Sequence, residues 1–262
     1  MQFLFHQQLS IISVIVLLSF LMYSFSVLDK NSNINKVYIV SLFLNLIIIV
    51  LDIAFDFIIK KGSISVYVPR VIGGLIFLLS PILSYLFLQF VCSYFSNYKI
   101  KRLIKTIFTV LLTLNSVVAF FSFKSKMFIE SINISEYKLP FLISIIFLFY
   151  SSFVIFSCKK MLIKFEYVYM ISISVIAIVL VLTQLFLNDA KFIWSGYTFI
   201  LILMFIVIQQ RELYRDPLTG ARNRLVLKKC LDAYNKKKEG NLSVVMIDLD
   251  YFKNINDYQK CI

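Results

Sequence analysis

Seven runs of about 20 apolar residues constrain this chain more than any other feature. A helix needs about 20 consecutive apolar residues to cross the hydrocarbon core of a bilayer. Phe, Ile, Leu and Val fill each run around the whole helix circumference, as lipid-facing helices require. The sequence therefore predicts an all-α bundle of seven transmembrane helices. Their expected ranges are 9–27, 37–59, 71–91, 103–123, 139–158, 167–187 and 192–208.

The first run resembles a secretion signal only in its hydrophobicity. It lacks a basic segment in front, since only His6 precedes it among side chains that can be cationic, and it lacks a cleavage site of small residues. We therefore expect it to be retained as a membrane helix. Composition agrees, because 60% of the residues are hydrophobic, against roughly 45–50% in soluble domains.

The net charge of +13 would suggest nucleic acid in a soluble protein. Here much of the Lys and Arg lies in short loops, which favours membrane topology and contact with anionic lipid, and no nucleic-acid partner is predicted. With the N-terminus outside, nine cations fall in inner loops and seven in outer loops, and the tail after residue 208 adds more. The positive-inside rule then predicts a cytoplasmic C-terminus. The inner-loop cations are Lys30, Lys36, Lys99, Lys101, Arg102, Lys105, Lys159, Lys160 and Lys164.

The composition changes sharply near Gln209, where charges become frequent. We predict three parts: a transmembrane sensor region over 1–208, a short connecting helix over 209–215, and a globular fragment over 216–262. Asp216-Pro217 is expected to end the connecting helix, because the residue before proline disfavours the helical conformation. The four cysteines show no CxxC pairing, so neither a disulfide nor a zinc site is predicted.

The tail then predicts a turn at Thr219-Gly220, a helix over 224–238 and a buried β-branched strand over 242–247. Asp248 follows that strand at its carboxyl end, with Asp250 just beyond. Two such carboxylates suit Mg²⁺, which prefers oxygen ligands shared with substrate phosphates. They also suit a solvated junction between strand and turn. The Asp-x-Asp pattern alone does not distinguish a metal site from such a junction.

The longer strings are more specific. Residues 216–224 read Asp-Pro-Leu-Thr-Gly-Ala-Arg-Asn-Arg, and residues 248–257 read Asp-Leu-Asp-Tyr-Phe-Lys-Asn-Ile-Asn-Asp. Together, in this order and spacing, they resemble the opening of a diguanylate cyclase domain of the GGDEF family. The resemblance covers about the last fifty residues, roughly the first third of such a domain. It implies that the transmembrane bundle is followed by an incomplete α/β domain of the nucleotide-cyclase type.

The resemblance also implies residue roles. Asp248 matches the metal-binding aspartate, and the backbone carbonyl of Leu249 would be a second ligand of Mg²⁺. Phe252 and Lys253 match the turn against the substrate phosphates, and Asn256 matches the asparagine that hydrogen-bonds guanine. The Asp216 and Arg224 positions of the first string are interpreted as structural or conformational.

The family reaction joins two GTP molecules into cyclic di-GMP, and its active site is completed across a homodimer. This sequence departs from the pattern after Asp257, where Tyr-Gln-Lys-Cys-Ile follows and the Gly-Gly-Asp/Glu-Glu-Phe string does not occur. No catalytic set is complete, and the acidic residue of that string would have been the other metal ligand. We therefore predict a truncated chain that is inactive as a cyclase by itself.

The second apolar run carries Asn45, Asp52 and Asp56, whose spacings of seven and four place them on one helix face. Ionisable residues at bilayer depth are candidates for function, so this face is a possible intramembrane sensor site. Asp56 can instead reach Lys60, four residues on, or extend to the interface. Elsewhere in the spans, Gln89, Asn115 and Gln184 are expected to be hydrogen-bond partners between helices, and Gly73-Gly74 and Pro81 suggest close packing and a kink.

These features favour a sensor of the diguanylate cyclase family in a bacterial inner membrane. The alternative is a non-enzymatic seven-helix receptor, transporter or regulator with a vestigial tail. A transporter should show inverted repeats and interrupted helices, and the sequence shows no convincing repeat.

Overall fold

The structure is a computed structural model of the 262-residue chain. It describes residues 2–61, 67–95, 98, 100–124, 138–162, 164–186, 192–214, 216, 219, 221–237, 243, 245–247 and 250–251. Contacts between Cα atoms divide the chain into two compact units, Met1–Arg211 and Glu212–Ile262.

The first unit is built from helices long and apolar enough to span a membrane, and the described residues contain seven of them. This confirms the number of predicted spans. Each observed helix overlaps its predicted run, with small differences at the ends. The helices are α1 (Gln2–Val27), α2 (Asn33–Lys61), α3 (Tyr67–Tyr94), α4 (Arg102–Lys124), α6 (Leu139–Ser157), α7 (Lys164–Phe186) and α8 (Ile193–Tyr214).

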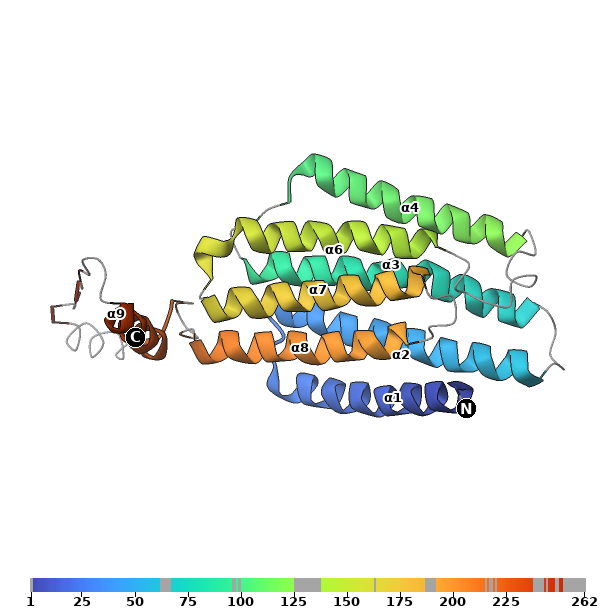
Figure 1. The fold of residues 1–262 in the computed structure, drawn as a ribbon, viewed down its shortest axis with the longest axis horizontal. Coiled ribbons are helices and arrows are strands. Elements are labelled where there is room, and N and C mark those ends of the chain that lie inside the picture. The colour runs from blue at the N-terminus through green and yellow to red at the C-terminus, as the bar shows by residue number, and fades with distance from the viewer. Residues whose placement is uncertain are drawn as a thin grey trace, which may run out of the picture. The chain divides into compact units, whose positions relative to one another are not determined.

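These seven helices lie side by side and alternate in direction (Figure 1). The α3 helix packs against α2, α4 and α6, while α6 also packs against α7, and α1 packs against α2. Half of the apolar window of α3 is buried inside the bundle, against 17% for α4. The α3 helix therefore lies inside the bundle, as do α6 and α8 with 50% and 56% of their windows buried, and α4 forms an outer wall.

The α3 helix is continuous through Pro81. Proline within a helix removes one backbone hydrogen bond, which is tolerated in membrane helices where neighbouring groups satisfy the freed backbone. Gly73 is buried in the same helix, as expected for a position of close packing. Most of the buried residues of α3 lie after Gly73.

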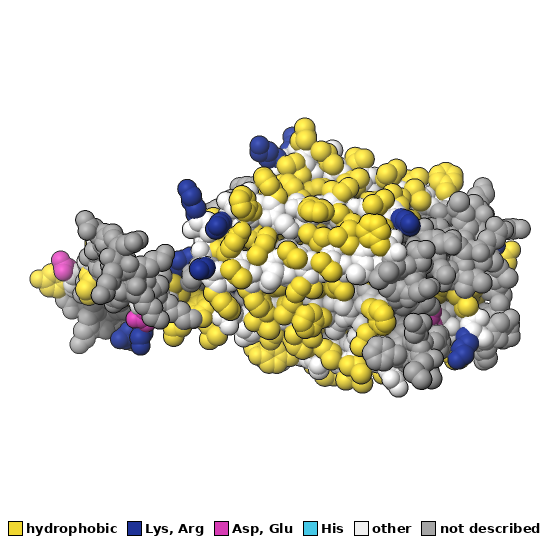
Figure 2. Space-filling model, in the orientation of Figure 1, with side chains coloured by type: hydrophobic (Ala, Val, Ile, Leu, Met, Phe, Trp, Pro, Cys, Tyr) yellow, Lys and Arg dark blue, Asp and Glu magenta, His cyan; other side chains and the backbone are white. Residues whose placement is uncertain are grey.

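Aromatic rings make several of the contacts between helices. Phe108 of α4 packs edge-on against Phe147 and Tyr150 of α6, with ring centroids 5.0 and 5.2 Å apart. Phe205 of α8 packs edge-on against Phe20 and Tyr23 of α1, at 5.2 and 5.4 Å. Apolar side chains also cover much of the outer surface of the bundle (Figure 2), as a helix bundle facing lipid requires.

The second unit contains α9 (Arg224–Lys237), close to the helix predicted over 224–238. The predicted strand over 242–247 is not seen in its described residues: 243 and 245–247 are not in a strand. Val245, Met246 and Ile247 are also largely exposed, so the prediction of burial there is wrong for this structure. A strand is buried only when paired strands and covering helices exclude water, and the described part of this unit provides one helix.

Candidate functional site

Thr219, in the first string of the predicted cyclase segment, lies in a turn after α8. The Asp216 carboxylate oxygen Oδ1 accepts hydrogen bonds from the Thr219 backbone N–H and the Thr219 hydroxyl, both at 2.9 Å. The Asp216 backbone N–H donates to the carbonyl of Ala221 at 2.8 Å, which closes the loop. Aspartate side chains commonly stabilise such turns by accepting from nearby backbone groups. The structure thus gives Asp216 a structural role, in agreement with its predicted one.

The α8 helix ends at Tyr214, just before this turn, as predicted from Asp216-Pro217. Beyond the turn the chain returns to the end of α8, where the backbone N–H of Asn223 donates to the carbonyl of Tyr214 at 3.1 Å. The Asn223 side-chain amide also donates to the carbonyl of Leu213 at 2.8 Å. These two bonds satisfy carbonyls in the last turn of α8, which lack partners within the helix.

Asn223 also begins α9. Its side-chain Oδ1 accepts from the backbone N–H groups of Leu225 and Val226, at 3.1 and 3.4 Å. Asparagine is among the preferred residues at a helix N-cap, because its side chain reaches the unpaired N–H groups of the first turn. Asn223 had no predicted role of its own, although an asparagine just before an amphipathic run is a recognisable N-cap signal.

The predicted substrate and metal residues Asp248, Leu249, Phe252, Lys253 and Asn256 lie outside the described residues. Between them, the turn residues Asp250 and Tyr251 are described, and both are exposed. Tyr251 has a φ of 56°, in the left-handed region that non-glycine residues seldom adopt. Among the residues that the structure describes, no three His, Cys, Asp or Glu side chains lie close enough together to hold a metal ion.

The structure places Asn45 of the predicted intramembrane site in a buried contact between α2 and α8. Its amide nitrogen donates to the Thr198 hydroxyl at 3.0 Å and lies 3.4 Å from the carbonyl oxygen of Trp194. Asn45 is fully buried, and its carbonyl oxygen Oδ1 makes no hydrogen bond. The residue therefore joins two helices, and nothing in its sequence position indicated Thr198 and Trp194 as its partners.

The two aspartates of that face differ in burial. Asp56 is buried and Asp52 is partly exposed. A second polar contact in the bundle interior joins the hydroxyls of Ser84 on α3 and Tyr197 on α8. Serine and tyrosine within spans gave no specific signal in the sequence, because their partners are distant along the chain.

Two of the other polar residues predicted to join helices are seen making hydrogen bonds. Asn115 of α4 donates to the carbonyl of Phe77 on α3 at 3.2 Å, which confirms a bond between helices. Gln89 instead donates to the Tyr85 hydroxyl one turn back on the same helix, at 2.8 Å. This bond does not join two helices as predicted for Gln89, because a residue four positions away lies on the same face of the same helix.

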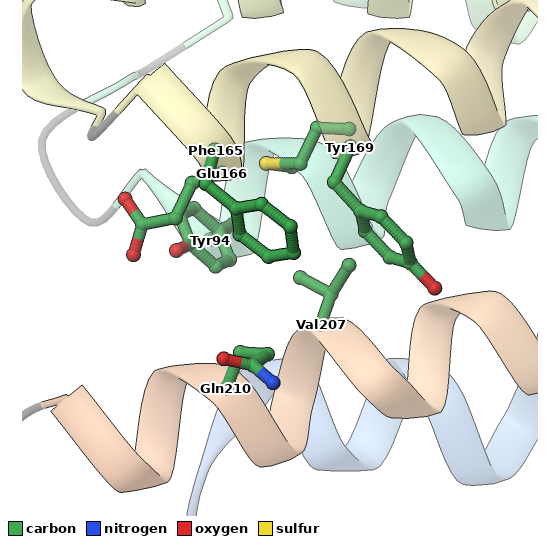
Figure 3. Close-up of a pocket in the computed structure, with 7 residues that line it drawn as sticks. Tyr94, Phe165, Glu166, Tyr169, Val207 and Gln210 are labelled. Atoms are coloured by element: carbon green, nitrogen blue, oxygen red, sulfur yellow. The ribbon is translucent and has the colours of Figure 1, made fainter.

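A small hollow lies between α3, α7 and α8 near the C-terminal end of α8. Aromatic rings dominate its walls: Tyr94 comes from α3 and Phe165 and Tyr169 from α7, with Val207 and Gln210 of α8 opposite (Figure 3). The guanidinium of Arg211 lies over the Tyr94 ring, 5.5 Å from its centroid. The hollow is apolar and small, so it offers little to orient a ligand.

The comparison with known families agrees with the resemblance found in the sequence. Residues 213–259 match the family model described as diguanylate cyclase, GGDEF domain. The match covers less than a fifth of the chain and contains both strings quoted above. The chain therefore combines a segment of GGDEF type with apolar helices of membrane-spanning length, seven of them among its described residues. No curated protein and no solved structure matches it.

Proposed function

We propose that this chain is a membrane-anchored signalling protein of the diguanylate cyclase family. In this proposal residues 1–208 are the sensory bundle, 209–215 the connecting helix and 216–262 the opening of an α/β cyclase domain. The GGDEF match at residues 213–259, which begins within the last apolar helix, carries the proposal. The hydrogen-bonded turn of Asp216, Thr219 and Asn223 supports it, because these residues belong to the first family string and hold its shape.

The residue roles follow the family pattern. Asp248 and the Leu249 carbonyl would hold Mg²⁺, Phe252 and Lys253 would lie against the GTP phosphates, and Asn256 would hydrogen-bond the guanine. Bound Mg²⁺ would neutralise charge on the phosphates as the nucleophile approaches. A homodimer is part of the proposal, because the family's reaction needs one GTP from each of two subunits.

We further infer that a polypeptide of residues 1–262 does not make cyclic di-GMP by itself. These residues contain no Gly-Gly-Asp/Glu-Glu-Phe string, whose acidic residue is a metal ligand in the family. Purified polypeptide incubated with GTP and Mg²⁺ should yield no cyclic di-GMP by mass spectrometry. Formation of cyclic di-GMP above a heat-treated control would contradict this inference.

A chimera tests the family assignment separately. The chain is continued after Asp257 with the remainder of a complete cyclase domain, and GTP turnover to cyclic di-GMP is measured. We expect activity in the chimera and its loss in the Asp248→Ala version, since the carboxylate would no longer hold the metal. The Lys228→Ala version serves as a control outside the proposed site. A well-folded chimera that is inactive would contradict the assignment of residues 216–257.

The proposed location is the bacterial inner membrane, with the C-terminus in the cytoplasm where GTP is found. A fluorescent protein fused after residue 262 should fluoresce, and alkaline phosphatase fused there should be inactive. The opposite pattern would separate the tail from GTP and overturn the proposed function.

The sensory role of the bundle is tested at Asp52. In the active chimera, Asp52→Asn removes a charge from α2 while keeping the side-chain shape. The proposal expects the ratio of stimulated to basal cyclic di-GMP output to change across growth conditions. An unchanged ratio would show that Asp52 has no sensory role. A separate variant, Asn45→Ala, tests the packing contribution of the other polar residue on this helix face.

A further inference from the structure

One group of cations at the bundle surface has no part in the function proposed above. Lys101, Arg102 and Lys105 lie at the start of α4, and Lys159 and Lys160 lie in a short 3₁₀ helix, η2 (Lys159–Met161), which follows α6. All five side chains are exposed. We call these five residues the basic corner. Figure 2 shows Lys and Arg side chains gathered at one end of the apolar bundle surface.

The two parts of the basic corner point toward the same end of the bundle, because α4 and α6 run antiparallel (Figure 1). The hydroxyls of Tyr98 and Tyr150 are 3.1 Å apart, and the Phe108 ring packs on Tyr150. Arg102 lies six positions before Phe108 and Lys159 nine after Tyr150. At about 1.5 Å per residue, both cations lie roughly 9–14 Å beyond this aromatic contact in one direction.

The two segments that carry the basic corner contain no carboxylate of their own. No Asp or Glu occurs in residues 57–129 or 137–165 of the sequence. Lys159 lies over the Tyr167 ring, 5.0 Å from its centroid, and the carboxylate nearest to Lys159 in sequence is Glu166 at the start of α7. The first turn of α4 contains no acidic residue, and cations there oppose the helix dipole. A bound anion would relieve this repulsion.

The depth of the basic corner indicates the source of that anion. The α6 helix has 19 residues, about 28 Å of helix, close to the thickness of the hydrocarbon core. The η2 cations directly after it therefore lie at the level of lipid headgroups. Next to them, α4 exposes Leu103, Ile107 and Val110, and α6 exposes Phe153 and Phe156. Cations above an apolar wall match a phosphate headgroup above its acyl chains.

We propose that the basic corner is a binding site for an anionic phospholipid, with its phosphate held by the α4 and η2 cations and its acyl chains along α4 and α6. This site distinguishes anionic from zwitterionic lipid, which a general hydrophobic surface does not. It concerns the bundle alone and is independent of the cyclase assignment, so either can fail without the other.

The test uses the full chain in detergent and native mass spectrometry with added lipid. Binding of dioleoylphosphatidylglycerol is compared with dioleoylphosphatidylcholine, which has the same acyl chains. We expect tighter binding of phosphatidylglycerol, and a loss of about tenfold or more in each of the pairs K101Q/K105Q and K159Q/K160Q, since each cation near a headgroup contributes appreciably. Equal affinity for the two lipids would overturn the proposal.

The matched control is K30Q/K36Q, which removes two cations at the same end of the bundle but on α2 and the connection before it. A loss equal to that of the corner pairs would mean general charge attraction and would overturn the site. K101R/K105R keeps the charge and should keep the affinity, so its failure also counts against the proposal. Displacement of phosphatidylglycerol by millimolar glycerol 3-phosphate would indicate a soluble phosphate ligand and overturn the lipid assignment.

Discussion

The sharpest prediction concerns Asn223, because its side chain forms hydrogen bonds with two helices. Its Oδ1 accepts from the first turn of α9, and its amide donates to the carbonyl of Leu213 in α8. Replacing an N-cap residue by alanine costs about 1 kcal/mol, and an exposed hydrogen bond contributes about 0.5 kcal/mol, the low end of the usual range. Asn223→Ala should therefore destabilise the first turn of α9 by about 1.5 kcal/mol, roughly tenfold in its opening equilibrium.

Hydrogen–deuterium exchange of the full chain measures this opening directly. The amides of Leu225 and Val226 should exchange roughly tenfold faster in Asn223→Ala. Asn223→Asp is the matched control: it keeps the accepting oxygen and places a negative charge at the helix N-terminus, where it is favourable, but it loses the amide donor. Those two amides should then exchange nearly as slowly as in the unsubstituted chain.

Two outcomes would refute this reasoning. Unchanged exchange of the Leu225 and Val226 amides in Asn223→Ala would mean that the side chain does not cap α9. Equal acceleration in Asn223→Ala and Asn223→Asp would mean that the accepting oxygen is not what holds the turn. Thermal unfolding of the bundle, followed by circular dichroism, should be unchanged in both variants, since Asn223 lies outside the bundle unit.

Three further predictions concern the bundle. A double-mutant cycle of Asn45→Leu and Thr198→Val, read from thermal unfolding in detergent, should give a coupling of about 0.5–1.5 kcal/mol, and zero coupling would contradict the bond between α2 and α8. A Cβ at Gly196 would lie 2.7 and 2.9 Å from the Leu180 methyls, so Gly196→Ala should cost about 1 kcal/mol, and Leu180→Ala should relieve that cost. Burial raises the pKa of the Cys158 thiol, so its reactive thiolate form is scarce at neutral pH. Maleimide labelling of Cys158 should therefore be slower than labelling of a free thiol, and it should accelerate as the pH rises. Rapid labelling at pH 7 would contradict the burial of Cys158.

The number of membrane helices was predictable because bilayer thickness sets a minimum apolar length, which is a property of each segment alone. The end of α8 and the start of α9 were predictable for a similarly local reason. Asp216-Pro217 disfavours helix, and the run after Asn223 has helical periodicity. The state of residues 242–247 was not predictable, because burial of a β-branched run depends on what covers it. The described residues of this segment are exposed.

The packing of the bundle could not be read from the sequence. Lipid-facing and protein-facing positions are both apolar, so the runs carry little periodic contrast to mark the buried side. The interior position of α3 and the outer position of α4 emerge only from the tertiary contacts. The same limit applies to Asn45: its spacing from Asp52 gave a helix face, but not the partner on α8.

The sequence by itself determined that this chain carries seven apolar runs long enough to span a membrane, followed by a segment resembling a diguanylate cyclase, because apolar length and short-range motifs belong to consecutive residues. The tertiary structure decided that Asn45 bonds to Thr198, that Asn223 joins the end of α8 to α9, and that the α4 and η2 cations leave the bundle at the same end. Each of these depends on side chains brought together by packing, and the free energy of packing belongs to pairs of helices, which no single segment reveals.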